Sequence, residues 1–338
     1  MLETTIAGSL PRPEWLAEPE KLKGGWKLTG QALEDGKRRA AAEWIRHEEN
    51  AGIDVVTDGE VFRIHFVHGF LEKIRGIDWQ KKTLMGIRDN RYQLEVPTVT
   101  GPLSRPAPVH LDEVKFTREQ TKKKLKFTLP GPMTICDTIA DAYYGSRPKM
   151  AMAFAEILNQ EARELEKAGV DVIQFDEPAF NVFTRDVKDW GIDALNTAIA
   201  GLKCTTATHI CYGYGIKENL DWKKTLGSEW RQYEEIFPAL NTSRIDQISL
   251  ECAGSKVPLS LLRLITDKKL MVGAIQVTGD RVETPEEVAA TLRAALEHVD
   301  AERVLPCTNC GMAPIGYDVA LGKLKALGAG AALVRKSL

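Results

Sequence analysis

The feature of this sequence that most constrains its fold is a short apolar run that recurs along the chain and ends each time in polar or glycine-rich residues. Runs of this length are typical of buried β-strands, and a polar tip after each run indicates a strand that ends at a solvent-facing rim. The runs occupy residues 4–9, 53–60, 125–132, 170–178, 207–213, 245–251, 270–277 and 303–311.

The segments between these runs have helical periodicity. Apolar residues recur on one face of segment 151–165, and Thr284 with Glu287 forms a capping box before another such segment. Alternating strands and helices predict an α/β fold with a parallel sheet, and eight such units predict a (β/α)₈ TIM barrel. A doubly wound open sheet is the structural alternative, but the sequence has neither its G-x-G-x-x-G turn after the first strand nor a P-loop.

The 338 residues are expected to form one catalytic barrel that spans 1–338. The stretch between about 61 and 124 is too long for a simple strand-to-helix connection, and residues 88–101 have the pattern of a β-hairpin. We therefore expect a helix and hairpin segment inserted between the second and third barrel strands.

Composition excludes several classes of partner. Lys and Arg number 45 against 47 Asp and Glu, so the net charge is −2 and offers no basic surface for nucleic acid or an anionic membrane. The sequence has no basic leader followed by an apolar stretch and no run long enough to span a membrane, which predicts a cytoplasmic protein. Its six cysteines are too sparse for a disulfide framework and instead suggest metal or thiol chemistry.

Metal-ligating residue types collect where the predicted strands end, which is the rim that carries function in parallel barrels. His209 and Cys211 are two residues apart, so an extended strand end would project both side chains to the same side. With Glu251 and a cysteine of the last strand, they form a nitrogen, sulfur and oxygen set that suits Zn²⁺. H-x-C alone also fits a core histidine and a buried cysteine, and Cys307-x-x-Cys310 also fits a redox pair or half of a structural zinc site.

Seven segments along nearly the whole chain resemble the C-terminal catalytic domain of the cobalamin-independent methionine synthase family. They occur in the family's order: IAGSLPRP (6–13), DVVTDGE (54–60), LPGPMTI (129–135), IQFDEPAF (173–180), THICYG (208–213), ISLE (248–251) and NCGM (309–312). The resemblance implies a zinc-dependent methyltransferase that converts homocysteine to methionine.

The resemblance also implies roles for individual residues. Cys310 is preferred to Cys307 because it occupies the Cys-Gly position of the family's last-strand motif, and Cys307 would then be a packed neighbour. Glu60 and Asp176 would hold the substrate ammonium, and the backbone around Ala7 and Ser9 would contact its carboxylate. The implied zinc ligands are His209, Cys211, Glu251 and Cys310.

Two departures from the family affect the methyl donor. Thr278 stands where the family has the histidine tied to protonating methylfolate, and Thr138 stands where it has the tryptophan that stacks on the folate ring. The chain also lacks the N-terminal half of full-length members. We therefore expect a short form whose donor is a methylated corrinoid or a methyl delivered by a partner, with methyltetrahydrofolate retained if Asp280 or His68 replaces the missing acid.

Two other functions are also compatible with the sequence. One is a zinc alkyltransferase that acts on another thiol such as coenzyme M, although a sulfonate would need cations, and the predicted strand ends offer mainly carboxylates, with Arg12 and Arg281 as exceptions. The other is a non-catalytic zinc-binding protein whose ligands close the site to substrate.

Overall fold

The computed structural model describes residues 1–18, 25–214 and 216–338. Seven strands form one curled sheet in which every neighbouring pair is parallel, in the order β1-β4-β6-β7-β8-β9-β10. Each strand overlaps one of the predicted runs, and β4, β7 and β9 begin one or two residues before theirs. Their bounds are β1 Val55–Val56, β4 Lys124–Pro130, β6 Val172–Asp176, β7 Thr205–His209, β8 Gln247–Glu251, β9 Lys269–Ile275 and β10 Val304–Thr308.

The first predicted strand, 4–9, is not a regular strand, but it occupies the position between the two edges of the sheet. Thr5 donates its backbone N–H to Pro306 of β10 at 3.0 Å, and Val55 of β1 donates to the carbonyl of Thr4 at 3.0 Å. The segment therefore joins β10 to β1, and the predicted (β/α)₈ barrel is confirmed with this irregular segment in the place of its first strand.

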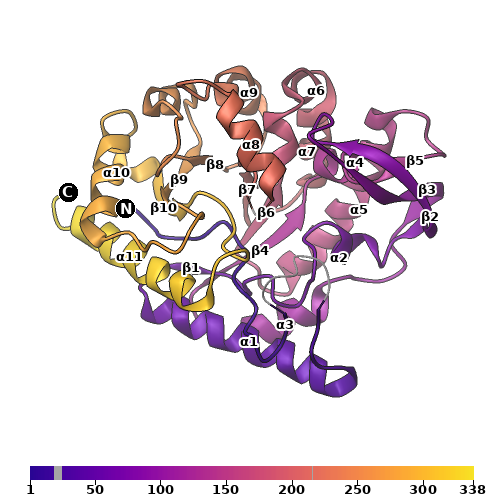
Figure 1. Ribbon diagram of the computed structural model, residues 1–338, viewed down its shortest axis with the longest axis horizontal. Helices are drawn as coiled ribbons and strands as arrows, with labels where there is room; N and C mark the ends of the chain where they lie inside the picture. Colours follow the sequence, from indigo (N-terminus) through magenta and orange to yellow (C-terminus); the bar gives the residue numbers. More distant parts are fainter. Residues whose placement is uncertain (19–24, 215) are drawn as a thin grey trace.

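Helices surround the sheet on its outer face (Figure 1). The predicted capping box is present, with Thr284 and Glu287 exchanging side-chain and backbone hydrogen bonds at the start of α10. The longer helices are α1 Gly30–Asn50, α3 Leu111–Glu119, α5 Arg147–Lys167, α7 Ile192–Ala198, α8 Lys217–Thr225, α9 Gln232–Thr242, α10 Pro285–Leu296 and α11 Tyr317–Arg335. Short turns of helix are α2 His68–Leu71, α4 Pro132–Cys136, α6 Thr184–Asp186, η1 Pro178–Asn181, η2 Val187–Gly191, η3 Leu259–Leu264 and η4 Ala301–Arg303.

The predicted insertion lies between β1 and β4. Its hairpin is longer than the predicted one. Strands β2 (Arg75–Ile87) and β3 (Tyr92–Ser104) pair antiparallel, and β3 also pairs with the short β5 (Ala140–Asp141). Between β2 and β3, Arg88, Asp89 and Asn90 all have positive φ angles, which turns the chain tightly. Figure 1 shows the hairpin leaving the barrel and reaching toward α8.

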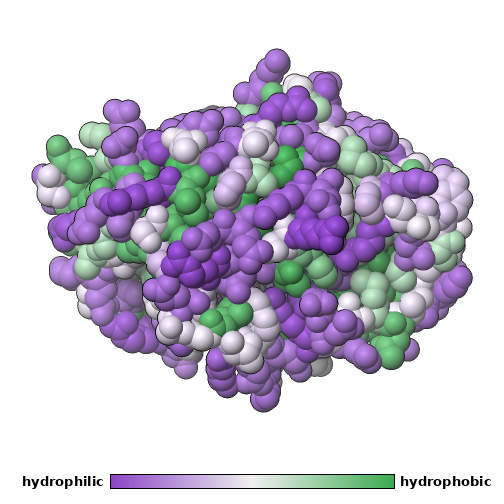
Figure 2. Space-filling view, turned by 90° about the horizontal axis from the view of Figure 1, so that it is seen from above, coloured by the Kyte–Doolittle hydropathy of each residue, from purple (hydrophilic) through white to green (hydrophobic). Residues whose placement is uncertain are grey.

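Apolar side chains fill the space between the sheet and the helices, and a smaller cluster that includes Val172, Ala207 and Cys307 lies apart from that core. The surface in Figure 2 is mainly hydrophilic, with small apolar areas between the polar side chains. Within the described residues, none of the helices has the length and apolar character needed to cross a membrane.

Candidate metal centre and substrate cavity

A cavity of about 390 Å³ opens where the carboxyl ends of the barrel strands meet. Its walls also include parts of the inserted hairpin and of the loops before α8 and α11. The predicted site residues Ala7, Ser9, Glu60, Asp176, His209, Cys211 and Cys310 all line this cavity. A single cavity therefore brings together residues from both ends of the sequence.

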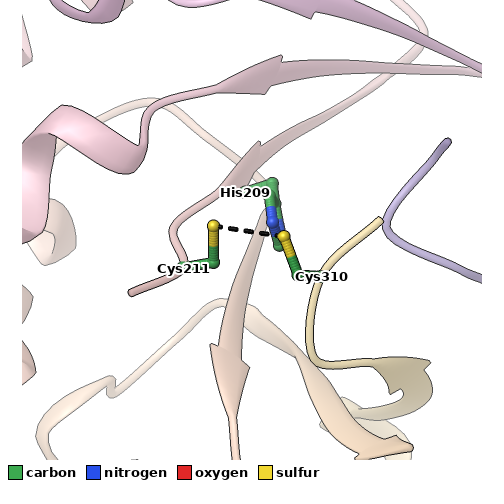
Figure 3. Close-up of side chains that lie close together, drawn as sticks. All are labelled: His209, Cys211 and Cys310. Atoms are coloured by element: carbon green, nitrogen blue, oxygen red, sulfur yellow. Dashed lines mark hydrogen bonds between the residues drawn. The ribbon is translucent and has the colours of Figure 1, made fainter. Parts of the chain in front are cut away.

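Three of the four predicted metal ligands converge in this cavity. His209 is the last residue of β7, Cys211 lies two residues beyond it, and Cys310 follows β10. Their ligand atoms all lie within 4.8 Å of one another, and the two sulfur atoms are 3.3 Å apart. Figure 3 shows the three side chains turned toward a common point. The three side chains therefore lie close enough together to share one ligand.

The imidazole of His209 is held in a way that suits a metal ligand. Its Nδ1 lies 2.7 Å from the hydroxyl of Ser249, while its buried Nε2 has no hydrogen-bond partner among the described residues. Metal-bound histidines commonly use one ring nitrogen for a hydrogen bond and the other for the metal. Together with two soft sulfur donors, this free nitrogen fits Zn²⁺.

The two thiols share one hydrogen bond, which separates their pKa values. Cys310 donates to Cys211, and this bond, followed by the nearby His209, holds the pKa of Cys211 well below its usual range. The same bond raises the pKa of Cys310. Burial lowers the pKa of His209, but the charges of Cys211 and Asp176 outweigh it, so that its pKa is raised. Cys211 is therefore the more readily ionised thiol.

Glu251, the fourth predicted ligand, lies beside this cluster but outside the set of three. Its carboxylate accepts hydrogen bonds from the Tyr212 backbone N–H at 2.7 Å and the Tyr214 hydroxyl at 2.6 Å, and Lys223 Nζ is 4.0 Å away. Burial raises the Glu251 pKa to about 7. Neighbouring groups thus fix the direction of this carboxylate.

Glu60 and Asp176 form an acidic pair in the cavity. Burial, and then the charge of Glu60, raise the pKa of Asp176 to about 7, and burial also raises the pKa of Glu60. Each carboxylate accepts one hydrogen bond from a neighbour, Glu60 from Thr128 at 3.0 Å and Asp176 from Gln174 at 2.8 Å. Two acids that face one cavity, Asp176 buried and Glu60 partly buried, suit a cationic ligand that would ionise both.

The motifs that contain Glu60 and Asp176 each carry a second acid, Asp58 and Glu177, and these two acids have structural roles. Asp58 forms a buried ion pair with Arg63 at 3.4 Å. Glu177 accepts hydrogen bonds from the N–H groups of Met133 and Thr134 and from the Thr134 hydroxyl, at 2.7 to 2.9 Å, which anchors the start of α4. Of these four acids, only Glu60 and Asp176 therefore remain for a ligand.

The N-terminal segment crosses the cavity close to Glu60. Ala7 donates its N–H to Thr308 at 2.9 Å and accepts from Gln174 at 2.5 Å, so both of its backbone polar groups are used within the protein. Gly8 has a φ of +149°, and a Cβ at this position would lie 2.6 Å from a Glu60 carboxylate oxygen. The position therefore requires glycine, and Ser9 is left as the nearest candidate to contact a ligand.

The two positions that depart from the family lie in different places. Thr138 lines the cavity, whereas Thr278 and Asp280 are not among the described residues that line it, and Thr278 instead accepts a hydrogen bond from Gln276 at 2.7 Å. His68 also lines the cavity, with its Nε2 3.5 Å from the carbonyl of Thr138. Of the two replacement acids considered from sequence, the geometry therefore favours His68.

Sequence reasoning missed the contribution of the insertion to this cavity. Arg91 and Tyr92, at the hairpin, line it together with Asn181 at the end of η1. The guanidinium of Arg91 stacks 3.1 Å from the ring centroid of Trp222 on α8, which brings the hairpin against the barrel rim. The hairpin pattern was visible in the sequence, but nothing in it indicated where the hairpin would rest.

The fold and site define a class of protein: an α/β barrel that carries a thiol-rich candidate metal centre and an acidic pair at its rim. Comparison with known proteins places the chain in a family with this fold. The family model described as the catalytic domain of cobalamin-independent synthase matches residues 2–332. The methionine synthase of Sulfolobus acidocaldarius is 34% identical over 100% of this chain and 94% of its own length, and that of Saccharolobus solfataricus is 32% identical over 100% and 96%.

Solved structures show the same relationship. A B12-independent methionine synthase from Shewanella sp. W3-18-1, in complex with selenomethionine, superposes with a TM-score of 0.97 at 59% identity, covering 100% of this chain and 98% of that chain. A methyltransferase from Methanosarcina mazei shares the fold, with a TM-score of 0.63 at 13% identity over 99% and 94%. The chain belongs to the cobalamin-independent methionine synthase family, which confirms the motif resemblance and the prediction of an enzyme of the methionine synthase type.

Proposed function

We propose that this protein is a zinc-dependent methyltransferase that transfers a methyl group to the sulfur of homocysteine and releases methionine. The observation that carries the proposal is the convergence of His209, Cys211 and Cys310 within 4.8 Å in the cavity that also holds Glu60 and Asp176. The full-length similarity to proteins named methionine synthase supports it.

The zinc ligands would be His209, Cys211 and Cys310, with Glu251 as the fourth. A zinc ion bound there supplies a positive charge that lowers the pKa of an incoming thiol. Ser249 orients the imidazole through its 2.7 Å contact with Nδ1, and Tyr214 orients the Glu251 carboxylate. These contacts orient the metal-ligating atoms of the two side chains, which limits the reorganisation needed when a substrate binds.

The remaining polar groups of homocysteine have matching partners in the same cavity. Its ammonium would lie between Glu60 and Asp176, which gain charge-assisted hydrogen bonds from it, and its carboxylate would lie at the backbone around Ala7 and Ser9, with Ser9 the main contact. During transfer a sulfur–carbon bond forms and the donor's bond to the methyl group breaks, with the electron pair remaining on the donor. The cavity residues thus position the sulfur for the transfer.

Homocysteine binding should weaken as the pH falls. Only an ionised carboxylate accepts the ammonium, and the pKa of Asp176 is raised to about 7, so protonation below that pH should raise the KM for homocysteine, approaching about tenfold per pH unit. The KM of wild type and Asp176→Asn between pH 5.5 and 8.5 checks this. A KM profile with the same slope in both proteins would contradict it.

We further propose that the methyl donor is not ordinary methylfolate but a methylated corrinoid or a methyl delivered by a partner protein. A tertiary amine is a poor leaving group until it is protonated, and losing a general acid slows such chemistry by roughly 10²–10⁴-fold. Thr278 supplies no such acid, and Thr138 offers no aromatic platform in the cavity. The contact of His68 with Thr138 instead favours methylfolate.

A turnover assay tests this proposal. Zinc-loaded enzyme with homocysteine and methylcobalamin should form methionine, and replacing the donor with methyltetrahydrofolate should slow turnover by about 10²-fold or more. Rapid turnover with methyltetrahydrofolate alone would contradict the donor assignment. Absence of methionine with every donor, together with no binding of homocysteine, would contradict the function itself.

The two rival functions fit the cavity less well. Coenzyme M has no ammonium for the Glu60 and Asp176 pair, and that pair would repel its sulfonate, although Arg12 also lines the cavity. A non-catalytic zinc protein has no need for an acidic cavity beside its metal, and here the cluster residues themselves line that cavity.

A further inference from the structure

Two polar side chains lie inside the barrel, beneath the cavity, and have no role in the chemistry proposed above. Lys126 on β4 and Gln174 on β6 are fully buried, and neither is among the described residues that line the cavity. Gln174 is two residues before Asp176 on the same strand, so both side chains point to the same side of β6 as Val172. Val172 belongs to an apolar cluster, so two polar side chains beside it require an explanation.

The ammonium of Lys126 is buried with neutral partners. In the described part of the chain it donates to the backbone carbonyl of Ile6 and to Oε1 of Gln174, the second at 2.9 Å. Burying a charge is costly even when its hydrogen bonds are satisfied, and an apolar side chain would avoid that cost. The charge at this position therefore indicates a role beyond filling the barrel interior.

The bond from Lys126 determines which way the Gln174 amide faces. An ammonium can only donate, so the amide oxygen faces Lys126 and the amide nitrogen faces the opposite side. Nε2 of Gln174 donates to the carbonyl of Ala7 at 2.5 Å and to Oδ1 of Asp176 at 2.8 Å. Asp176 therefore meets a hydrogen-bond donor, which fixes one of its carboxylate oxygens and leaves the other for a ligand.

The same hydrogen bonds connect the two groups proposed to hold the amino-acid end of homocysteine. Asp176 would hold the ammonium, and segment 6–9 would hold the carboxylate. The Lys126 and Gln174 side chains bind the carbonyls of the first two residues of this segment. Homocysteine carries its ammonium and its carboxylate on one carbon atom, so the distance between the two binding groups of the protein must match a fixed distance in the ligand.

We propose that Lys126 and Gln174 are positioning residues that fix the distance between Asp176 and segment 6–9. They thereby make the cavity selective for thiols that carry an ammonium and a carboxylate on the same carbon atom, as an α-amino acid does. The inference rests on the proposed function. Both residues act through the groups that contact the substrate.

Affinities for three thiols test this positioning role. Homocysteine has both groups, 3-mercaptopropylamine lacks the carboxylate, and 4-mercaptobutanoate lacks the ammonium. Dissociation constants are measured by titration calorimetry on zinc-loaded wild type, Lys126→Met and Gln174→Met. A thiol with one of the two groups can shift with its single partner, so each variant should weaken homocysteine about 10–100-fold and the other two thiols by no more than about threefold.

Lys268→Met is the matched control. Lys268 is another buried lysine that donates to a backbone carbonyl, that of Ser243 at 2.9 Å, but the described residues that line the cavity do not include it. K268M loses a buried hydrogen bond of the same kind, and all three affinities should stay within about twofold of wild type. A thermal unfolding curve for each variant shows that it is folded, and Q174M replaces K126M in the comparison if K126M does not fold.

The pattern across the three thiols decides the inference. A loss confined to homocysteine in K126M or Q174M, at unchanged zinc content, supports it. Unchanged homocysteine affinity in the folded variants would overturn it, as would equal weakening of all three thiols, which indicates the loss of a binding group rather than of its alignment. Failure of the proposed function is a separate result, because wild type itself would then bind no homocysteine.

Discussion

Replacing Cys310 with serine should strip tightly bound zinc from the protein and abolish methyl transfer to homocysteine. Cys310 contributes one of the two sulfur donors in the cluster, 3.3 Å from that of Cys211, and a serine hydroxyl is a far weaker ligand for zinc. Structural zinc sites bind with about 10–16 kcal/mol, so losing one of four ligands should cost roughly 3 kcal/mol, or about 100-fold in affinity and at least that in turnover. Zinc content after dialysis against a chelator, and methionine formation at saturating zinc, measure both effects.

Cys252 provides the matched control. It follows Glu251 directly, but its sulfur is not part of the cluster formed by the described residues, and its backbone N–H bonds to the carbonyl of Gly273 at 3.2 Å. Cys252→Ser should keep both its zinc and its activity. Equal zinc loss in C252S and C310S would mean that the cluster does not hold the metal.

Neutralising Asp176 should be the most damaging change to homocysteine binding that leaves the zinc in place. Asp176→Asn keeps the shape of the side chain but replaces the charge that would face the substrate ammonium. A hydrogen bond to a charged group contributes about 1.5–3 kcal/mol, so the KM for homocysteine should rise roughly 10–100-fold, and Glu60→Gln should have a similar effect. Steady-state kinetics with homocysteine as the varied substrate, alongside zinc content, give the measurement.

Glu177→Gln separates substrate binding from structural support. Glu177 is adjacent to Asp176 in sequence, but it bonds the start of α4 through Met133 and Thr134. E177Q should lower the free energy of unfolding by about 1–3 kcal/mol while leaving the homocysteine KM within about twofold of wild type. The two roles would be contradicted if D176N lowered the free energy of unfolding while E177Q raised the KM for homocysteine.

The features of the fold and site that could be predicted from sequence are those that depend on local pattern. The i, i+2 spacing of His209 and Cys211 in the predicted strand 207–213 predicted that both side chains reach one rim, because strand geometry alternates with a period of two. The capping box at Thr284 predicted the start of α10 for the same local reason. Motif resemblance added the choice of Cys310 over Cys307, which spacing alone could not make.

The parts that could not be read depend on contacts between distant segments. Lys126 and Gln174 are polar residues within apolar strands, yet both are buried and bind the N-terminal segment, which explains why residues 4–9 lie between β10 and β1 without regular pairing. The resting place of the hairpin depends on Arg91 meeting Trp222, which is 131 residues away by number. The direction of the Glu251 carboxylate depends on Tyr214, and no spacing rule predicts a rotamer.

X-ray absorption at the zinc edge, with and without homocysteine, shows whether the proposed ligands hold a metal to which the substrate sulfur binds. Because the proposed ligands include the sulfurs of Cys211 and Cys310, the zinc shell should contain two sulfurs in the resting enzyme and a third after homocysteine is added, at the expense of an oxygen from Glu251. A shell that binds no additional sulfur while homocysteine saturates the protein would contradict the account.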